Sequence, residues 1–255
     1  MFRIEIKDSL AKIYFCKTEN RNALSIEALD ALINIIKELN NDLGIKTISI
    51  FSELNNVFVS GADIREFSKF RYKEGKDYGK KGHLLMNTIE NSNKPIIAAI
   101  NGYAVGGGFE LALACHIKFA TENAKFGFPE VKLGILPGFG GSQRIFDYVG
   151  KSIATDLILT GKIIDVDVAS KYSLINYLVD SNNLEIEIEK YALELASNSS
   201  TGIKFAIKSI NNRFNKVRTN ALNHEIEYLA ECMNNKDFIE GTSAFLQKRK
   251  QNFND

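Results

Sequence analysis

From Lys94 to Leu113 the chain reads Lys-Pro-Ile-Ile-Ala-Ala-Ile-Asn-Gly-Tyr-Ala-Val-Gly-Gly-Gly-Phe-Glu-Leu-Ala-Leu, two apolar runs separated by turn residues. The first run, Pro95–Ile100, predicts a short buried strand, because proline can begin a strand but cannot donate inside its ladder. An asparagine–glycine pair then predicts a turn. The second run, Phe109–Ala114, predicts a buried helix that opens at three consecutive glycines, Gly106–Gly108. The order is therefore strand, turn and helix.

The glycines at the start of this helix point to an anion-binding site. The first turn of a helix has unpaired N–H groups and a partial positive charge, and glycine lets a ligand approach them closely. Glu110 lies in this first turn, roughly 3 Å along the axis from Gly108. A second strand-to-helix turn at Gly61-Ala62 offers another N–H, and two such donors make an oxyanion hole. The alternative is that these glycines only permit tight turns and close packing.

Composition and charge narrow the class of protein. The chain has 255 residues, of which 45% are hydrophobic and 25% charged, which is typical of one globular core. A net charge of +1 gives no basic field for nucleic acid, so we expect no nucleic-acid partner. The glycine pattern is neither G-x-G-x-x-G nor a Walker loop, which disfavours dinucleotide and ATP sites.

The cysteine, histidine and hydropathy patterns bear on disulfides, metal binding and cellular location. Cys16, Cys115 and Cys232 are widely spaced and odd in number, which fits reduced, buried thiols. The three histidines form no metal-like cluster with them, so we expect no metal site. No apolar run approaches 18 residues and the start of the chain alternates like a strand, so we expect no membrane span and a cytoplasmic location.

Strand and helix patterns alternate until about residue 184, after which only helices are predicted. Ser25 is a good N-cap for a helix to Leu39. The polar segment Glu66–Glu90 predicts a helix interrupted by three glycines and therefore mobile. The other expected elements are a hairpin at 2–7 and 11–16, strands at 46–51, 57–60, 117–120, 125–126 and 175–179, and helices at 142–149, 151–159, 166–171, 185–197, 201–214, 221–233 and 237–248.

Four charged residues are candidates for chemistry. Glu110 and Glu130 are candidates for a carboxylate pair, because two carboxyls at one apolar site separate their pKa values and suit a general acid and base. For Glu110 the alternative is a buried salt bridge. For Glu130 the alternative is a solvated loop residue, and the spacing in the sequence alone favours this alternative. Asp63 fits a helix N-cap, and Lys248 fits either a solvated helix end or a phosphate ligand.

Five segments, in this order along the chain, resemble the crotonase superfamily, and enoyl-CoA hydratase in particular. They read Phe-Val-Ser-Gly-Ala-Asp-Ile-Arg-Glu at 58–66, Asn-Gly-Tyr-Ala-Val-Gly-Gly-Gly-Phe-Glu at 101–110, Phe-Gly-Phe-Pro-Glu at 126–130, Leu-Pro-Gly-Phe-Gly-Gly-Ser-Gln-Arg at 136–144 and Ser-Ala-Phe-Leu-Gln-Lys-Arg-Lys-Gln-Asn-Phe at 243–253. The resemblance spans nearly the whole chain.

The resemblance implies an α/β fold, a crotonase-like spiral of ββα units followed by a C-terminal helical trimerisation region. Residues 1–196 would form the core with the acyl-CoA site, and residues 197–255 the oligomerisation region of a homo-trimer or a homo-hexamer made of two trimers. The substrate would be an acyl-CoA thioester, with coenzyme A as part of the substrate and no separate cofactor.

The resemblance also assigns residue roles. The N–H groups of Ala62 and Gly107 would hold the thioester oxygen, with Gly138 in support. Glu110 would act mainly as base on the water, while Glu130 delivers the proton to Cα. The coenzyme A path would be lined by Ala62, Asp63, Ile64 and Arg65, with Lys248 near the phosphates.

The implied activity is hydration of a 2-enoyl-CoA to a 3-hydroxyacyl-CoA, as in fatty acid β-oxidation. One alternative is a 3-enoyl-to-2-enoyl-CoA isomerase, but such relatives commonly keep only the carboxylate equivalent to Glu130. Another is a non-catalytic CoA-ester or RNA-binding relative. Three residues depart from the usual pattern: Phe128 stands for a frequent glutamine, His116 for a frequent aspartate, with an expected structural effect only, and Thr18 for a frequent proline.

Overall fold

The computed structural model describes residues 1–16, 19–234 and 236–252, except for the side chains of 212–221 and 224. Thr18 and Phe253 lie outside these residues. The strands form a six-stranded sheet in the order β1-β2-β3-β5-β7-β10 and a four-stranded sheet in the order β4-β6-β8-β9. The strands are β1 Phe2–Lys7, β2 Leu10–Phe15, β3 Thr47–Ser52, β4 Val57–Val59, β5 Ile96–Ile100, β6 Tyr103–Val105, β7 Ile117–Thr121, β8 Lys125–Gly127, β9 Ile163–Asp165 and β10 Tyr177–Val179.

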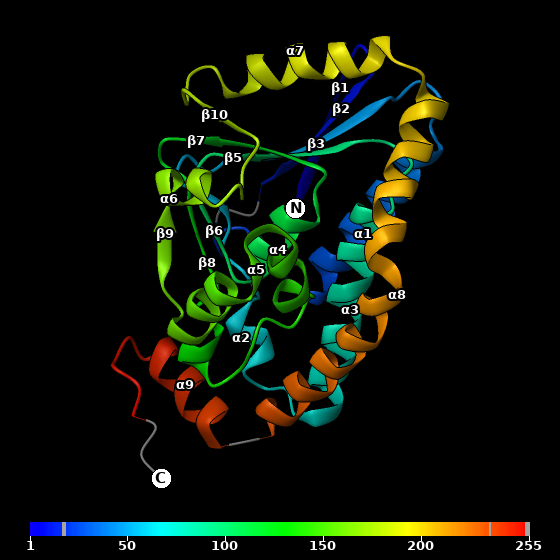
Figure 1. The fold of residues 1–255 in the computed structure, drawn as a ribbon. Helices are drawn as coiled ribbons and strands as arrows, with labels where there is room; N and C mark the ends of the chain where they lie inside the picture. The colour runs from blue at the N-terminus through cyan, green and yellow to red at the C-terminus, as the bar shows by residue number, and fades with distance from the viewer. Residues whose placement is uncertain (17–18, 235, 253–255) are drawn as a thin grey trace.

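Helices lie on both sides of the larger sheet (Figure 1). They are α1 Ile26–Asn41, α2 Ile64–Phe67, α3 Tyr72–Glu90, α4 Gly107–Ala114, the 3₁₀ helix η1 Pro129–Leu133, α5 Gly141–Thr160, α6 Val166–Lys171, α7 Leu184–Ser197, α8 Ser200–Met233 and α9 Lys236–Leu246. No helix among the residues described is long and apolar enough to cross a membrane.

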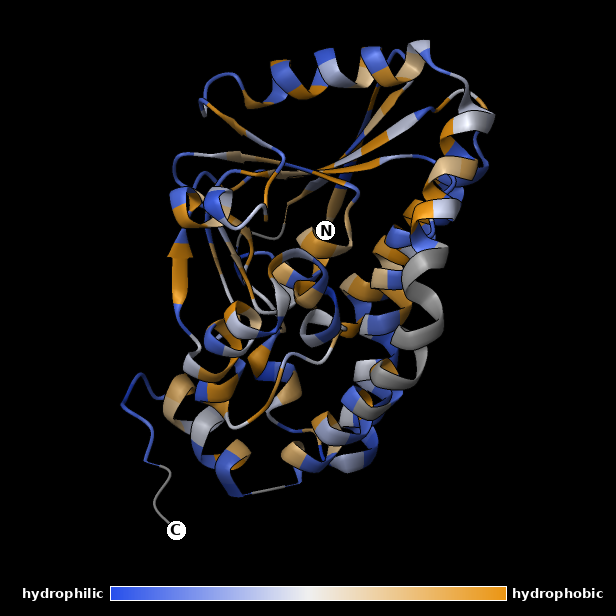
Figure 2. Ribbon diagram, in the orientation of Figure 1, coloured by the Kyte–Doolittle hydropathy of each residue, from blue (hydrophilic) through white to orange (hydrophobic). Residues whose placement is uncertain are grey.

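The larger sheet is mostly parallel, and both of its faces are covered. Only β1 runs antiparallel, to β2, while β2, β3, β5, β7 and β10 run parallel. Strand β5 alternates between two cores: Ile97 and Ala99 pack under α7, and Ile96, Ala98 and Ile100 belong to the larger core on the other face. Burial on both faces explains why this strand reads as a continuous apolar run. Figure 2 shows the hydrophobic segments concentrated in the strands and inner helix faces.

Most predicted elements are confirmed. Ser25 caps α1 by accepting a hydrogen bond from the Ala28 N–H. Gly150 has a non-helical φ of 68° inside α5, so the predicted division between residues 149 and 151 is present as a kink. All three cysteines are free thiols, but the expected burial is complete only for Cys115, since Cys16 and Cys232 are partly exposed. Strands β6 and β9, of three residues each, were not predicted.

Two predictions about the helices are wrong. The segments 201–214 and 221–233 are parts of one helix, α8, of 34 residues. Helix α3 is continuous through its glycines, which are buried rather than disruptive. A Cβ atom on Gly75 would lie 2.3 Å from the Met233 Sδ, and one on Gly82 would lie 1.9 Å from the Phe139 ring. The glycines allow close packing of α3, so the mobility expected from them loses its basis.

Candidate active site

Two glycine turns meet at one side of α4. Gly61 and Gly106 have φ angles of 98° and 53°, which favour glycine because an L side chain is strained there. The two turns touch, since a Cβ atom on Gly61 would lie 3.6 Å from the Gly107 nitrogen. Within the described residues, neither the Ala62 N–H nor the Gly107 N–H donates a hydrogen bond. Both donors are therefore free to bind a ligand.

These donors border a cavity of about 770 Å³. Every residue proposed for the site from the sequence lines this cavity: Ala62, Asp63, Ile64, Arg65, Gly107, Glu110, Glu130, Gly138 and Lys248. The residues come from five separate parts of the chain. The cavity is large enough for a small organic ligand, whose sites in proteins usually measure roughly 300–1,000 Å³.

Glu110 is held by the start of the following long helix. Its side chain is 2% exposed, and its Oε1 accepts hydrogen bonds from the Phe139 N–H at 2.8 Å and the Gly141 N–H at 2.7 Å. Gly141 is the first residue of α5, so the carboxylate lies at a helix N-terminus, where negative charge is stabilised. The salt-bridge alternative for Glu110 is wrong, because backbone amides and no cation bind it among the described residues.

Glu130 faces the same cavity from η1. It is 8% exposed, so the interpretation as a solvated loop residue is wrong. Within the described chain its Oε2 is buried without a hydrogen-bond partner. Its Oε1 lies close to the second glycine turn, 3.0 Å from where a Cβ on Gly106 would be. A buried carboxylate with one unpartnered oxygen is suited to bind a polar group of a ligand.

The two carboxyls have raised pKa values. Burial is the main cause for Glu110, and the charges of Glu130 and Glu225 add to it, so the pKa lies well above the ordinary value. Burial, helped by Glu225, raises the pKa of Glu130 to about 8. A carboxyl with a pKa of about 8, as for Glu130, can exchange a proton with a substrate near neutral pH.

The raised pKa of Glu130 makes stability depend on pH. A carboxyl whose pKa is higher in the folded than in the unfolded chain stabilises the fold below the unfolded pKa, and this contribution is lost as the pH rises through about 8. Glu130→Gln removes this loss, so we expect it to raise the stability at pH 8.5 by at most ~5 kcal/mol. The gain should shrink towards pH 5. Thermal unfolding of wild type and of Glu130→Gln between pH 5 and 8.5 tests this prediction. A stability difference between the two proteins that is the same at every pH would contradict it.

Asp63 and Lys248, two charged residues predicted for a coenzyme A path, both line the cavity. Asp63 is the N-cap of α2, as predicted, and accepts a hydrogen bond from the Arg65 N–H at 3.1 Å. The Asn20 side chain also donates to it. The Arg65 guanidinium is largely exposed and lies 3.5 Å from Asp63. Lys248 follows α9, with a positive φ of 55°.

The two described departures from the usual pattern are both buried. The Phe128 ring packs at a tilt against Phe109, with ring centroids 4.8 Å apart, and lies with Glu110 against Gly141. The His116 Nδ1 accepts from the Ile96 N–H at 2.9 Å, and its Nε2 donates to the Glu90 carbonyl at 3.1 Å. Burial lowers the pKa of His116 to about 4, so the ring stays neutral. The expected structural effect of His116 is confirmed.

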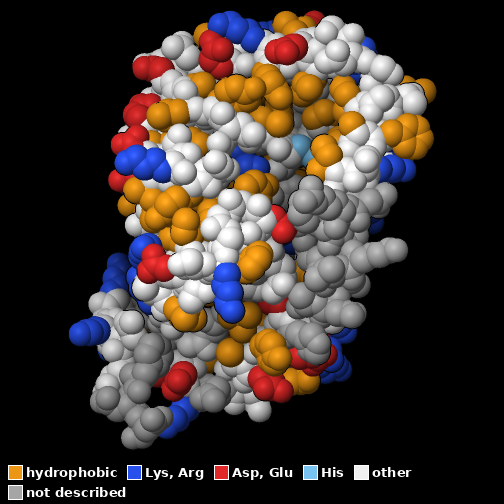
Figure 3. Space-filling model, in the orientation of Figure 1, with side chains coloured by type: hydrophobic (Ala, Val, Ile, Leu, Met, Phe, Trp, Pro, Cys, Tyr) orange, Lys and Arg blue, Asp and Glu red, His pale blue; other side chains and the backbone are white. Residues whose placement is uncertain are grey.

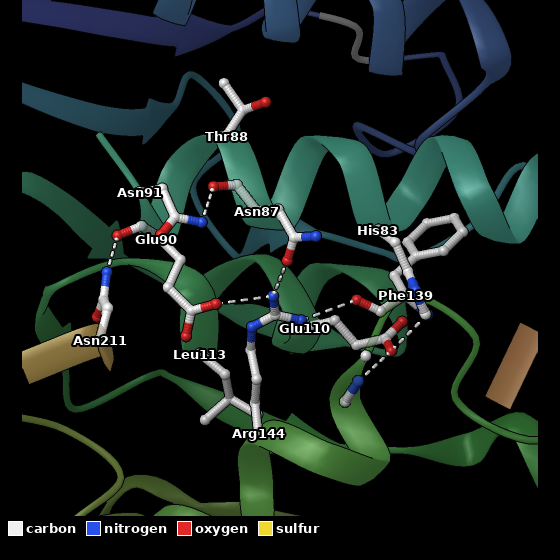
Figure 4. Close-up of polar contacts among 12 residues, drawn as sticks. His83, Asn87, Thr88, Glu90, Asn91, Glu110, Leu113, Phe139, Arg144 and Asn211 are labelled. Carbon is white, nitrogen blue, oxygen red and sulfur yellow. Dashed lines mark hydrogen bonds and ion pairs between the residues drawn. The ribbon is translucent and has the colours of Figure 1, made fainter. Parts of the chain in front are cut away.

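The sequence analysis missed the residues that support Glu110. Glu225 on α8 accepts a hydrogen bond from the Gly140 N–H, and Arg144 on α5 donates to the Phe139 carbonyl. Figure 4 shows Arg144 extending from α5 to Asn87 and Glu90 on α3. One signal was present: Glu225 lies on the helix face of Leu222, Ile226 and Leu229, where an apolar residue is expected.

Comparisons with known proteins identify the family of this chain. A family model described as enoyl-CoA hydratase/isomerase matches residues 5–255. A crotonyl-CoA hydratase of Syntrophomonas wolfei is 35% identical over 250 residues, covering 98% of this chain and 96% of the relative. A short-chain-enoyl-CoA hydratase of Clostridium acetobutylicum is also 35% identical, over 247 residues, covering 97% of this chain and 95% of the relative.

Solved structures give the same result. The enoyl-CoA hydratase of Bacillus anthracis has a TM-score of 0.80 at 29% identity, covering 99% of this chain and 98% of that one. The enoyl-CoA hydratase of Bacillus halodurans has a TM-score of 0.89 at 24% identity, covering 95% and 99%, and this likeness shows the fold. The predicted crotonase fold, with two mixed sheets and C-terminal helices, is confirmed. The chain therefore belongs to the enoyl-CoA hydratase/isomerase family.

Proposed function

We propose that this protein is an enoyl-CoA hydratase that adds water reversibly across the 2,3 double bond of a 2-enoyl-CoA. The observation that carries the proposal is one cavity that is lined by two buried carboxyls and by two backbone N–H groups without a hydrogen-bond partner in the described part of the chain. Its relatives in Syntrophomonas and Clostridium are named crotonyl-CoA and short-chain-enoyl-CoA hydratases, which supports this substrate class.

The backbone donors stabilise the charge that forms on the thioester. As water adds to Cβ, electron density moves to the carbonyl oxygen, where the N–H groups of Ala62 and Gly107 bind more strongly than in the ground state. Losing one such donor typically costs ~3–4 kcal/mol of barrier. Gly138 lies on the same cavity and supports the site.

The two carboxyls divide the proton transfers. Both amides that orient Glu110 bind its Oε1, which leaves Oε2 to take a proton from the water. The water oxygen then bonds to Cβ. Glu130, with its unpartnered Oε2 and raised pKa, delivers a proton to Cα. The product is a 3-hydroxyacyl-CoA, and one water has been consumed.

The coenzyme A part of the substrate would extend along the segment from Ala62 to Arg65. Lys248 would approach its phosphates, because a lysine ammonium binds phosphate as a point charge. Residues 62–65 and Lys248 all line the cavity. Placement in fatty acid β-oxidation follows from this substrate class.

Assembly into trimers, or hexamers of two trimers, through the C-terminal region is part of the proposal. Helices α8 and α9 expose apolar side chains, which are typical of an interface: Phe205, Ile210, Tyr228, Ile239, Phe245 and Leu246. Hydrophobic side chains also gather on the upper half of the face in Figure 3, where Figure 1 places α7 and β10. Light scattering on the purified protein should give three or six times the chain mass of 28.5 kDa, and a monomer would contradict it.

Crotonyl-CoA is the first substrate to test. We expect the absorbance of its conjugated thioester to fall when the protein is added, because hydration removes the conjugation. Enoyl-CoAs of increasing length should then be compared. If crotonyl-CoA and longer enoyl-CoAs all remain unchanged, the proposed function is wrong.

An isomerase is the second candidate, favoured by the unpartnered Glu130 oxygen. Such an enzyme would move a 3,4 double bond with Glu130 alone. The Glu110→Gln variant separates the two functions, since it should keep most of an isomerase activity and lose hydration. RNA binding has no support in a chain with a net charge of +1.

A further inference from the structure

A third buried carboxylate, that of Glu225, lies behind the active site. It comes from α8 in the C-terminal part of the chain, is 2% exposed and does not line the cavity. Its Oε1 accepts hydrogen bonds from the Gly140 N–H at 2.5 Å and from the His83 Nε2 at 2.8 Å. Its Oε2 accepts from the Ser142 hydroxyl. Three hydrogen-bond donors to one buried carboxylate indicate that its position is specifically fixed.

Glu225 and Glu110 bind alternate amides of the same loop. The N–H groups of Phe139 and Gly141 donate to Glu110, and that of Gly140, between them, donates to Glu225. Gly140 has a φ of 95°, a conformation that the loop must hold for neighbouring amides to reach different carboxylates. Glu110 on α4 and Glu225 on α8 thus both bind backbone amides at the N-terminus of α5.

Helix α3 supports this arrangement through one face. His83 holds Glu225, while Asn87 and Glu90, four and seven residues further on, accept from Arg144. Arg144 in turn donates to the Phe139 carbonyl at 3.1 Å. The loop that orients Glu110 is therefore fixed from α3 and α8 together, and α8 is tied to it through Glu225.

We propose that Glu225 is a positioning residue for the reaction: by holding Gly140 and Ser142 it aims the Phe139 and Gly141 amides at the base, Glu110. This inference rests on the proposed hydratase function. Glu225 does not line the cavity, so it acts on the reaction from outside the substrate site. Without its charge the loop relaxes, and Glu110 loses its fixed orientation towards the water.

The charge of Glu225 also acts on the two reacting carboxyls. Burial is the main cause of the raised pKa of Glu110 and of Glu130, and Glu225 raises both further. Among the side chains that the structure describes, the titratable groups that interact with Glu225 are Glu110 on α4, Glu130 on η1 and His83 on α3. Arg144 on α5 lies beside Gly140, whose N–H Glu225 binds, and on α8 itself Glu227 pairs with Lys76. Removing the charge of Glu225 should therefore move both limbs of the pH profile to lower pH.

The test compares Glu225→Gln with wild type and with Glu227→Gln, a control on the same helix whose partners are Lys76 and Tyr72. For crotonyl-CoA we expect Glu225→Gln to lower kcat by about 10- to 100-fold with KM nearly unchanged. Both limbs of its kcat/KM profile should shift to lower pH, an effect that a purely structural role would not produce. The control should match wild type. An unchanged kcat, or a fall in kcat with unshifted limbs, overturns the proposal.

Two further measurements keep the proposal testable. If Glu225→Gln does not fold, Ser142→Ala removes one donor to Glu225 and should lower kcat by about threefold or more at constant KM, since misplaced groups slow the reaction; an unchanged kcat overturns the inference. If wild type hydrates no enoyl-CoA, the proposed function fails by itself. Hydrogen exchange then decides: about tenfold faster exchange at residues 139–141 in the variant supports positioning, and equal exchange refutes it.

Discussion

Glu110→Gln and Glu130→Gln are each expected to lower kcat for crotonyl-CoA hydration by about 10²–10⁴-fold, the usual contribution of a general acid or base. Glutamine keeps the shape of each side chain, and its carbonyl oxygen at position 110 can still accept from the Phe139 and Gly141 amides. The loss therefore reports on proton transfer. Initial rates at saturating substrate measure it.

Two comparisons sharpen this result. Glu187→Gln changes an exposed glutamate on α7 that pairs with Lys190, and it should behave as wild type. The double variant of positions 110 and 130 should lose little more than the worse single variant, because both carboxyls serve one transition state. Full activity in either single variant would exclude that carboxyl from the chemistry.

Gly108→Ala is expected to lower the melting temperature by about 6–12 °C, corresponding to a loss of ~3 kcal/mol in a chain of this size. A Cβ atom at this position would lie 2.0 Å from the Val59 carbonyl oxygen and 2.7 Å from its carbon. Those are backbone atoms of β4, which cannot move aside like a flexible side chain. Because β4 leads to Ala62 and α4 begins at Gly107, activity should fall as well.

Gly202→Ala is the matched control. Gly202 also lies in the first turn of a helix, but a Cβ atom there would meet only Ser199, at an ordinary 3.5 Å. Alanine is the better helix former, so this variant should melt at the wild-type temperature or slightly above it. If Gly108→Ala were as stable as this control, β4 and α4 would have to separate without cost, and close packing would not be the reason for glycine at 108.

Local patterns in the sequence were sufficient for much of the fold and for the two glycine turns. Ser25, the glycine turns and the apolar run of β5 act through neighbours in the chain, so their signals can be read in one window. The pairing of Glu110 with Glu130 could not be predicted from a local pattern. Spacing favoured a solvated Glu130, and only the family resemblance placed it in the site, where the structure buries it.

What could not be predicted depends on contacts between distant segments. The Phe139 and Gly141 amides reach Glu110 across about 30 residues, and Glu225 lies 85 residues from Gly140. The glycines of α3 are a second example. Their low helix propensity predicts interruptions of the helix, whereas in the structure side chains of α8 pack closely against Gly75 and Gly79. The contacts of the two glutamates and the role of the α3 glycines both depend on side-chain burial, which a short stretch of sequence does not reveal.

The glycines of α3 also have a consequence for the size of molecule that the protein can accept. Leu229 and Met233 pack into the spaces left at Gly79 and Gly75, and the same two side chains form a wall of the cavity. The volume of the cavity beside Leu229 and Met233 is thus determined by how closely α3 and α8 approach each other. An engineer who wished to admit a bulkier acyl group would shorten Met233 and leave α3 untouched.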